Sequence, residues 1–169
     1  MALDQIVKTK RDGTITIIDG AGTPKTLTVD FEAGDLNISI PGPAVNVFLN
    51  RGQFGTTPSL RYGDSQPCTG TFTAYMRDLI DATEATLEGI VTNTGYFASD
   101  WISTLDSAGN AEVKTVKIVF ALEGTDHGGT DQAITLDDCH LTGSLSEGDP
   151  NMINVSFTAY MDFPTIAAV

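Results

Sequence analysis

Residues 72–76 have the sequence Phe-Thr-Ala-Tyr-Met, and residues 157–161 have the same sequence. The match continues upstream at the same offset, at Ser-Leu (59–60 and 144–145) and at Gly-Asp (63–64 and 148–149). Nine of the eighteen aligned positions are identical without a gap. In each copy Phe, Ala and Met alternate with Thr and Tyr, which is the period of a strand with one buried face. The repeat predicts one domain with two copies of a turn-and-strand unit, in which two sheets are related by approximate symmetry.

Other segments alternate in the same way. Residues 13–19 and 25–32 are rich in Thr, Ile and Val, and the Gly and Pro between them predict a hairpin. Further strands are predicted at residues 35–40, 68–76, 113–122, 132–138, 140–146 and 152–162. The predicted fold is therefore mostly β, an antiparallel β-sandwich or barrel with one flanking α-helix.

The helix is expected in residues 78–94, where apolar side chains recur at helical spacing. Asp81 and Glu84 are placed as a capping box, and Gly95 is placed as the stop. All of residues 1–169 are expected to form this single domain, with an amino-terminal arm at 1–12 and a long loop at 41–67. That loop is rich in Gly and Pro but too apolar for a linker, so we expect it to pack against something.

The net charge of −13 is distributed unevenly. Residues 1–77 contain seven Lys and Arg against seven Asp and Glu, whereas residues 78–169 contain only two Lys against fifteen Asp and Glu. A protein that holds nucleic acid places Lys and Arg against phosphates. The composition therefore opposes nucleic-acid binding, and it is also typical of an acidic surface that keeps a protein soluble.

Nothing in the sequence indicates catalysis strongly. Gly63-Asp64-Ser65 with Asp137 and His140 imitates the motifs of a serine hydrolase, but the second repeat has Pro150 in place of Ser65, which points to a turn. No His, Cys or carboxylate pair has zinc spacing. Asp126, Asp131, Asp137 and Asp138 lack the spacing of a calcium loop, so a solvated acidic loop is the favoured interpretation. We expect no enzyme activity, no metal and no cofactor.

The cellular context follows from two absences in the sequence. No apolar run approaches the roughly 20 residues of a membrane span, and no apolar stretch follows the basic residues near the amino terminus. We therefore expect synthesis in the cytoplasm. Cys68 and Cys139 are then expected to be reduced core residues and not a disulfide.

Several motifs resemble the major tail tube proteins of tailed bacteriophages. They are Arg51-Gly52-x-Phe54-Gly55, Arg61-Tyr62-Gly63-Asp64, Phe72-Thr73-Ala74-Tyr75, Gly124-Thr125-Asp126-His127-Gly128, Leu136-x-x-Cys139-His140-Leu141-Thr142-Gly143 and Glu147-Gly148-Asp149-Pro150-Asn151. The similarity runs in order through most of residues 12–162.

The resemblance implies a structural virion protein, favouring the long non-contractile tail. Six copies would form a ring, and rings would stack head to tail into a tube for genome ejection. The implied partners are other copies of the chain, the tape-measure protein, and tail terminator and tail tip proteins. DNA would pass through the lumen without specific binding, and no catalytic residue is implied.

The residues themselves offer candidate surfaces for such an assembly. A wide, water-filled barrel needs strands with one apolar and one polar face, and an acidic wall would leave DNA unbound. The candidate lumen-lining residues are Thr28, Asp30, Asp35, Asn37, Ser39, Thr71, Thr73, Ser156 and Thr158. Stacked rings also need a protruding element. The candidate inter-ring contacts are Val45, Val47, Phe48, Leu49 and Phe54, with the amino-terminal arm as a second element.

Two alternatives stay open. A tube protein of a type VI secretion system would share the architecture and differ in its partners. A monomeric β-sandwich that binds carbohydrate or peptide belongs to another class, and it would be expected to show an exposed aromatic platform. One Trp and four Tyr, two of them inside the repeat, supply such a platform poorly.

Overall fold

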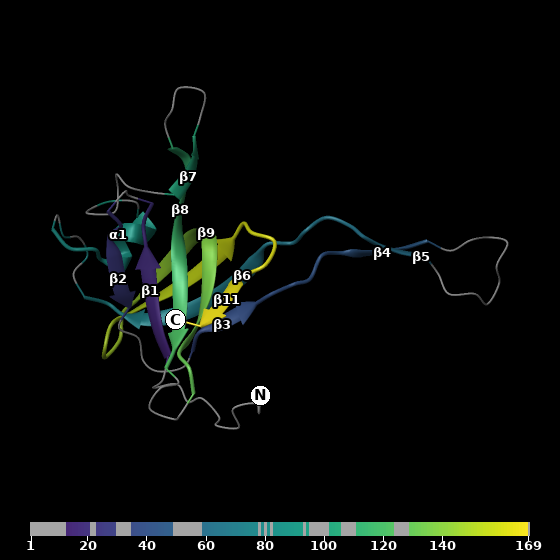
Figure 1. The fold of residues 1–169 in the computed structure, drawn as a ribbon. Coiled ribbons are helices and arrows are strands. Elements are labelled where there is room, and N and C mark those ends of the chain that lie inside the picture. The colour runs from purple at the N-terminus through teal and green to yellow at the C-terminus, as the bar shows by residue number, and fades with distance from the viewer. Residues whose placement is uncertain are drawn as a thin grey trace.

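The computed structural model describes residues 13–20, 23–29, 35–48, 59–77, 79, 81, 83–92, 94, 102–105, 111–123 and 129–168 (Figure 1). Several sequence-based candidates lie outside these residues: the amino-terminal arm at 1–12, Asp30, Leu49, Phe54, the predicted helix stop Gly95, and Asp126.

Eleven strands and one short helix make up the described chain. They are β1 (Gly13–Ile18), β2 (Thr26–Val29), β3 (Asn37–Ser39), β4 (Val45–Phe48), β5 (Ser59–Tyr62), β6 (Cys68–Tyr75), α1 (Leu87–Thr92), β7 (Ile102–Leu105), β8 (Ala111–Leu122), β9 (Gln132–Ser146), β10 (Met152–Ala159) and β11 (Thr165–Ala168). All strand pairs are antiparallel. The predicted class, mostly β and antiparallel with one helix, is confirmed.

Nine strands form one sheet in the order β2-β1-β8-β9-β10-β6-β3, with β11 paired to β9 and β7 paired to β8. The predicted amino-terminal hairpin is β1 with β2, in which Ile15 lies opposite Val29. In Figure 1, β1 and β8 cross in front of β6, so the sheet is folded into two layers. One layer is β2-β1-β8-β9-β11, and the other is β9-β10-β6-β3.

The long strand β9 joins the two layers because it bends at its centre. Asp138 has a positive φ of 51°, and the register between β8 and β9 shifts between Val116 and Ile118. A bulge of this kind adds a residue to one strand and bends it. Before the bend β9 pairs with β8 and β11. After it β9 pairs with β10, and Cys139 also lies opposite Val116 of β8. The two strands predicted at 132–138 and 140–146 are thus one bent strand.

The core lies between the layers. Ile15, Ile17 and Ile118 from the first layer are at most 1% exposed, and so are Ile153 and Val155 from the second. Other members of the same cluster come from β6, β9, β10 and α1: Cys68, Phe72, Ala74, Leu87, Ile90, Leu136, Cys139, Leu141, Phe157 and Ala159. At roughly 25 cal/mol per Å² of apolar surface removed from water, this cluster is the main favourable contribution to folding.

The two copies of the repeat lie side by side and not in two sheets, which corrects the sequence-based prediction. They are β6 and β10, and Thr71 lies directly opposite its repeat equivalent, Ser156. The approximate two-fold axis therefore passes between these two residues. The buried pair Phe72 and Phe157 packs with ring centroids 6.4 Å apart. A Cβ at Gly70 would collide with the Phe157 ring, which explains why this position has no side chain.

The helix is shorter than predicted and begins later. Asp81 Oδ1 accepts hydrogen bonds from Thr83 N at 2.5 Å and Glu84 N at 3.0 Å, so it caps a turn. The hydrogen bond that Thr83 Oγ1 donates to the same oxygen lowers the pKa of Asp81 most, and the two backbone hydrogen bonds lower it further. The helix itself is capped by Thr86, whose Oγ1 accepts a hydrogen bond from Gly89 N at 3.1 Å. The short Thr and Asp side chains form hydrogen bonds with the backbone here, so they favour a separate turn over an earlier start of the helix.

The predicted loop at 41–67 contains a hairpin of β4 and β5 that makes its own two-stranded sheet. Figure 1 shows this hairpin projecting away from the body of the protein. The ladder continues toward the body, because Gly63 N donates to Ala44 O at 2.6 Å and Ala44 N donates to Asp64 O at 3.2 Å. We call β4 and β5 the arm. In its described residues it does not pack on its own subunit.

Candidate functional site

The outer face of the second layer carries the largest set of aligned polar side chains. Residues directly opposite each other in a sheet point to the same side. Asn37, Thr71, Ser156 and Thr142 form one row across β3, β6, β10 and β9. Two neighbouring rows contain Ser39, Thr69, Thr158 and His140, and Thr73, Asn154 and Ser144. We call these eleven residues the polar face.

The polar face is exposed while the opposite side of the same strands is core. In β10, Asn154 and Ser156 are exposed, whereas Ile153, Val155 and Phe157 are buried. Thr73 Oγ1 donates to Asn154 Oδ1 at 3.1 Å, so neighbouring strands are also linked through side chains. The layer therefore presents mainly hydroxyl and amide groups to water.

Six of the nine candidate lumen residues belong to the polar face: Asn37, Ser39, Thr71, Thr73, Ser156 and Thr158. Asp35 is exposed just before β3 and has no place in these rows. Sequence reasoning missed Thr69, Asn154, His140, Thr142 and Ser144. The three of these that lie on β9 could have been predicted from the alternation of polar residues between 140 and 146.

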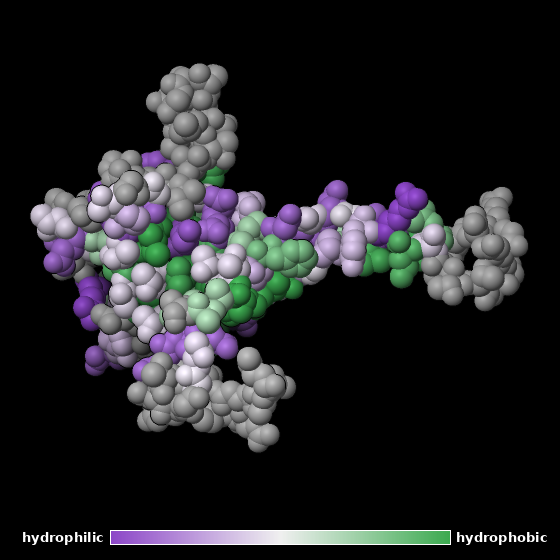
Figure 2. All heavy atoms as spheres, viewed as in Figure 1, coloured by the Kyte–Doolittle hydropathy of each residue, from purple (hydrophilic) through white to green (hydrophobic). Residues whose placement is uncertain are grey.

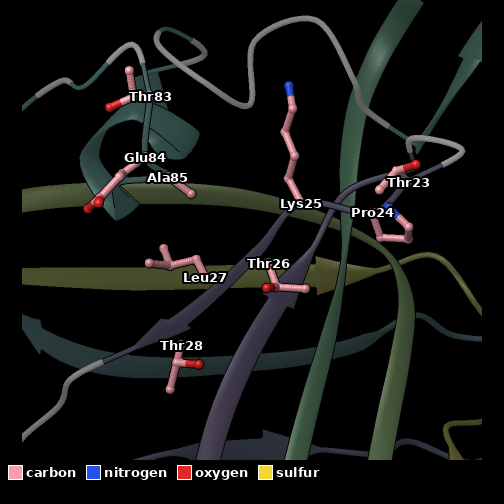
Figure 3. Close-up of a pocket in the computed structure, with 9 residues that line it drawn as sticks. All are labelled: Thr23, Pro24, Lys25, Thr26, Leu27, Thr28, Thr83, Glu84 and Ala85. Carbon is pink, nitrogen blue, oxygen red and sulfur yellow. The ribbon is translucent and has the colours of Figure 1, made fainter.

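Thr28 is separated from the other candidates. It lies on β2, opposite Thr16 and at the far end of the sheet order from β3. Figure 3 shows it at an open groove of about 660 Å³ between β2 and the segment before α1. The groove is lined by Thr23, Pro24, Lys25, Thr26, Leu27, Thr28, Thr83, Glu84 and Ala85. This mixed lining offers no distinctive set of reactive groups.

The polar face carries no Asp, Glu, Lys or Arg among the residues that the structure describes on it. Its only titratable side chain is His140, whose Nδ1 lies 3.3 Å from Lys114 O. Acidic side chains lie elsewhere: Asp137 and Asp138 at the bend of β9, and Glu147 and Asp149 in the turn before β10. The polar face therefore lacks the acidic groups that the composition led us to expect on such a surface.

Both ends of the polar layer have open edges. Within the described ranges, β3 pairs only with β6, and residues 140–146 of β9 pair only with β10. Each of these edges presents backbone N–H and C=O groups that a further strand can pair with. The edges lie on opposite sides of the layer, so a copy placed at one edge leaves the other open.

The arm has an apolar face of its own. Val45 lies opposite Tyr62, and Val47 lies opposite Leu60, so all four side chains point to one side. They are 55%, 81%, 56% and 61% exposed, respectively. The other side carries Asn46, Arg61, Phe48 and Ser59. Figure 2 shows hydrophobic side chains on the arm well away from the body.

Of the candidate inter-ring contacts, Val45 and Val47 lie on this apolar face. Phe48 is 54% exposed on the opposite face of the arm. Leu60 and Tyr62 were missed, although their alternation with Ser59 and Arg61 follows the period of a strand. The arm thus brings together residues from both ends of the long loop.

The residues that imitate the motifs of a serine hydrolase do not form a hydrogen-bonded catalytic site in the described structure. Gly63 and Asp64 belong to the ladder at the base of the arm, while His140 is held at Lys114 O. No hydrogen bond joins Ser65 to His140 in the part of the chain that the structure describes. Among those residues there is also no group of three or more His, Cys, Asp or Glu that could hold a metal ion. No described helix has the length and apolar character needed to cross a membrane.

Cys68 and Cys139 are both free and buried. Burial raises the pKa of Cys68, and burial is also the main reason that the pKa of Cys139 is raised to about 12. Both thiols are therefore protonated at neutral pH and serve as packing groups in the core.

No protein-family model matches the chain, and neither does any curated protein. Among solved structures, the chain is similar to the sheath/tube terminator of an extracellular contractile injection system, PVC, in its extended state. The match has a TM-score of 0.56 at 13% sequence identity, and it covers 97% of this chain and 99% of that chain. The two chains share a fold. At this identity the likeness concerns the fold alone.

Proposed function

We propose that the chain is a structural subunit of a phage-tail-like tube, in which copies close side by side into rings and the rings stack. One observation carries the proposal: a layer of strands has a buried face, an exposed uncharged polar face, and open edges at both ends. The fold shared with a tube terminator supports it.

Ring closure uses the two open edges. If β3 of one copy pairs beside residues 140–146 of β9 in the next, every copy makes the same head-to-tail contact. Such heterologous contacts form a ring when the rotation between copies closes. The polar faces then join into one barrel wall, and closure also covers edges that would otherwise promote aggregation. Six copies per ring is the number that the family resemblance implies.

The chemistry of the polar face suits a lumen that DNA crosses. Duplex DNA is retained by Lys and Arg that replace its counterions. Thr, Ser and Asn side chains hydrate well and offer no such charge, so the duplex moves past without a specific contact. The wide barrel also stays filled with water because its inner face is polar. An uncharged wall thus replaces the acidic wall expected from the composition.

Stacking uses the arm. A two-stranded hairpin is marginally stable in water by itself. The four exposed apolar residues of the arm therefore need a partner surface, and a neighbouring ring supplies one. Under this proposal the protein belongs to the tail of a virion, is made in the host cytoplasm, and has the tape-measure, terminator and tip proteins as further partners.

The decisive experiment is negative-stain electron microscopy of the purified chain over a range of concentrations. We expect rings with a central hole, and hollow tubes at high concentration. Analytical ultracentrifugation of the same samples measures the mass of the ring. A single species of one subunit at every concentration would contradict the proposal and favour the monomeric binding module.

A second candidate is a terminator, because the similar solved structure is a sheath/tube terminator. A terminator caps a tube and does not extend it. The same images separate the two, since a tube subunit grows into long hollow filaments whereas a terminator stops at single rings. Single rings that bind only to the ends of preformed tubes would favour the terminator.

A further inference from the structure

Strand β5 has a different partner from the one that the repeat predicts for it. Residues 59–60 of β5 correspond to residues 144–145 of β9, which pair with β10 across the connection 147–151. Residues 63–67 form a connection of the same length between β5 and β6, and a loop of about five residues suits a hairpin. Yet β5 pairs with β4, and β3 lies beside β6. The first copy of the repeat therefore leaves unused a hairpin that the second copy forms.

The repeat also sets the register of that unused hairpin. In the second copy Ser144 lies opposite Asn154. Subtraction of the repeat offset, 85 residues, places Ser59 opposite Thr69. Both of these side chains are exposed, and Thr69 belongs to the polar face. The hairpin would thus add a hydroxyl to the polar face, in the place that Ser39 holds in the described structure.

The same register turns the apolar side of the arm toward the core. Leu60 would lie opposite Cys68, which is fully buried. Val47 lies opposite Leu60 in the arm, and the two are 56% and 61% exposed, respectively. Both would move to the core side of the layer, whereas Asn46 and Arg61 on the other side of the arm would stay in water. Removal of apolar surface from water therefore favours this pairing.

Strand β3 holds the competing position with a short ladder. Among the described residues, only its three members, 37–39, pair with β6. The ladder of β5 would also be short, because Pro58 and Pro67 border its two pairs and proline has no N–H to donate. Two segments thus compete for one edge of β6 with ladders of similar length. A small difference of this kind allows one sequence to populate two arrangements.

The connection after β5 has a different role in each copy of the repeat. Gly148 N donates to Asn151 Oδ1 at 3.0 Å in the turn between β9 and β10. The equivalent Gly63 extends the arm instead, because its N donates to Ala44 O at 2.6 Å and Asp64 O accepts from Ala44 N at 3.2 Å. A change of partner for β5 costs these two hydrogen bonds and makes the connection a hairpin loop. A few loop residues are sufficient for a hinge of this kind.

We propose that the free subunit exchanges between two conformations of the arm. In the open conformation, which is the described one, the arm projects and β3 lies beside β6 (Figure 1). In the closed conformation β5 replaces β3 beside β6, and the arm lies along its own layer. Closure removes the arm from stacking and displaces the β3 edge from ring closure. The closed conformation therefore restrains assembly of the free subunit, and this consequence rests on the proposed function.

Engineered disulfides measure the exchange in dilute, unassembled protein. Ser59→Cys with Thr69→Cys joins two positions that lie opposite each other in the closed conformation. Ser39→Cys with Thr69→Cys reports the open conformation, in which these residues are opposite. The matched control is Ser59→Cys with Thr73→Cys, because Thr73 lies on the same face of β6, roughly 13 Å further along the strand. The native thiols are buried, and each single variant controls for them.

We expect the 59–69 disulfide to form about tenfold faster than the 59–73 disulfide in a glutathione redox buffer. Mass spectrometry should show it within one chain and not between two chains. The 39–69 disulfide should form in the same buffer, and circular dichroism should show the fold retained in all three variants. These rates require no assembly, so they test the exchange independently of the proposed function.

The linked chains test the restraint on assembly. With the 59–69 disulfide formed, we expect single subunits at concentrations at which the wild-type chain forms tubes, and a reducing agent should restore the tubes. With the 39–69 disulfide formed, β3 cannot be displaced, so tubes should form at the wild-type concentration or below it. Tubes from the 59–69 linked chain would overturn the restraint.

The remaining outcomes separate the two proposals. Equal rates for the 59–69 and 59–73 disulfides, with the 39–69 disulfide formed, overturn the closed conformation and leave the proposed function standing. A wild-type chain that never assembles, in which the 59–69 disulfide still forms preferentially, overturns the proposed function and leaves the strand exchange standing. Failure of the 39–69 disulfide to form would contradict the pairing of β3 with β6 from which the inference starts.

Discussion

The second half of β9 and strand β5 carry the same sequence unit but have opposite surroundings. Ser144 and Leu145 pair with β10 inside the sheet, whereas their repeat equivalents, Ser59 and Leu60, leave the body and pair with β4 in the arm. If β5 followed its repeat equivalent, it would pair with β6 as the second half of β9 pairs with β10. Strand β3 occupies that position instead, with Ser39 opposite Thr69. One unit thus forms part of the nine-stranded sheet in one copy and part of the protruding arm in the other.

This difference shows how a single domain can use one sequence unit in two structural settings. Strands in the body have one face fixed by the core, so their other face is free to be polar. Strands in the arm have no core beneath them, and both of their faces are exposed. Among the described residues, the apolar side of the arm is therefore exposed. The variants below contrast the body with the arm, in order of decreasing expected effect.

The largest contrast comes from removing a phenylalanine in each region. Phe72→Ala empties a site that is 2% exposed, and we expect the free energy of unfolding to fall by about 4 kcal/mol. Phe48→Ala in the arm removes a ring that is 54% exposed, so stability should change by less than about 0.5 kcal/mol. Urea denaturation of the two variants measures both values. Equal losses would mean that the arm packs on the body in solution.

Adding side chains at two glycines is the reverse test. Gly70→Val collides with the Phe157 ring and with Asn37 O, and we expect a loss of about 3 kcal/mol. Gly42→Val has nothing within 4 Å of its new Cβ and should leave stability nearly unchanged. Thermal unfolding followed by circular dichroism compares the pair. A tolerated Gly70→Val would contradict the close packing of β6 on β10.

The bend of β9 can be tested at Asp138, which has a φ of 51°. A β-branched residue is strained there, so Asp138→Val should cost about 1–2 kcal/mol. Asp138→Gly relieves the same strain and should cost much less, which makes it the matched control. If valine and glycine had equal effects in urea titrations, the backbone at this bend would not be the determinant that we infer.

The smallest effect concerns the core thiol Cys139, whose pKa is about 12 in the folded protein against 9.0 for an ordinary cysteine thiol. The unfolded chain loses this proton first as the pH rises, so stability falls above pH 9. We expect the free energy of unfolding at pH 10 to be about 1 kcal/mol below its value at pH 8. Cys139→Ala should remove that part of the pH dependence. In the arm, Leu60→Cys should react rapidly with a thiol reagent at pH 8.

Much of the architecture could be predicted from sequence because its strands have one solvent-exposed and one buried face. The hairpin of β1 and β2, strands β6, β8 and β10, and six polar-face residues all follow from period-two alternation. The predictions failed at one strand pairing between segments distant in sequence and at one local turn. Residues 132–146 form one strand because a bulge accommodates the bend, and the helix begins only after Thr86 because side chains of Asp81 and Thr83 satisfy the turn before it.

The sequence by itself determined the class of fold, the alternating faces of the strands and the repeated unit, because these depend on neighbours along the chain. Only the tertiary structure decided that β3 and not β5 lies beside β6, that the polar rows align across β3, β6, β10 and β9, and that the arm stands free. The physical reason is that strand pairing is a competition between segments far apart in sequence. Each segment has nearly the same local preference, and the packing of the whole core selects among them.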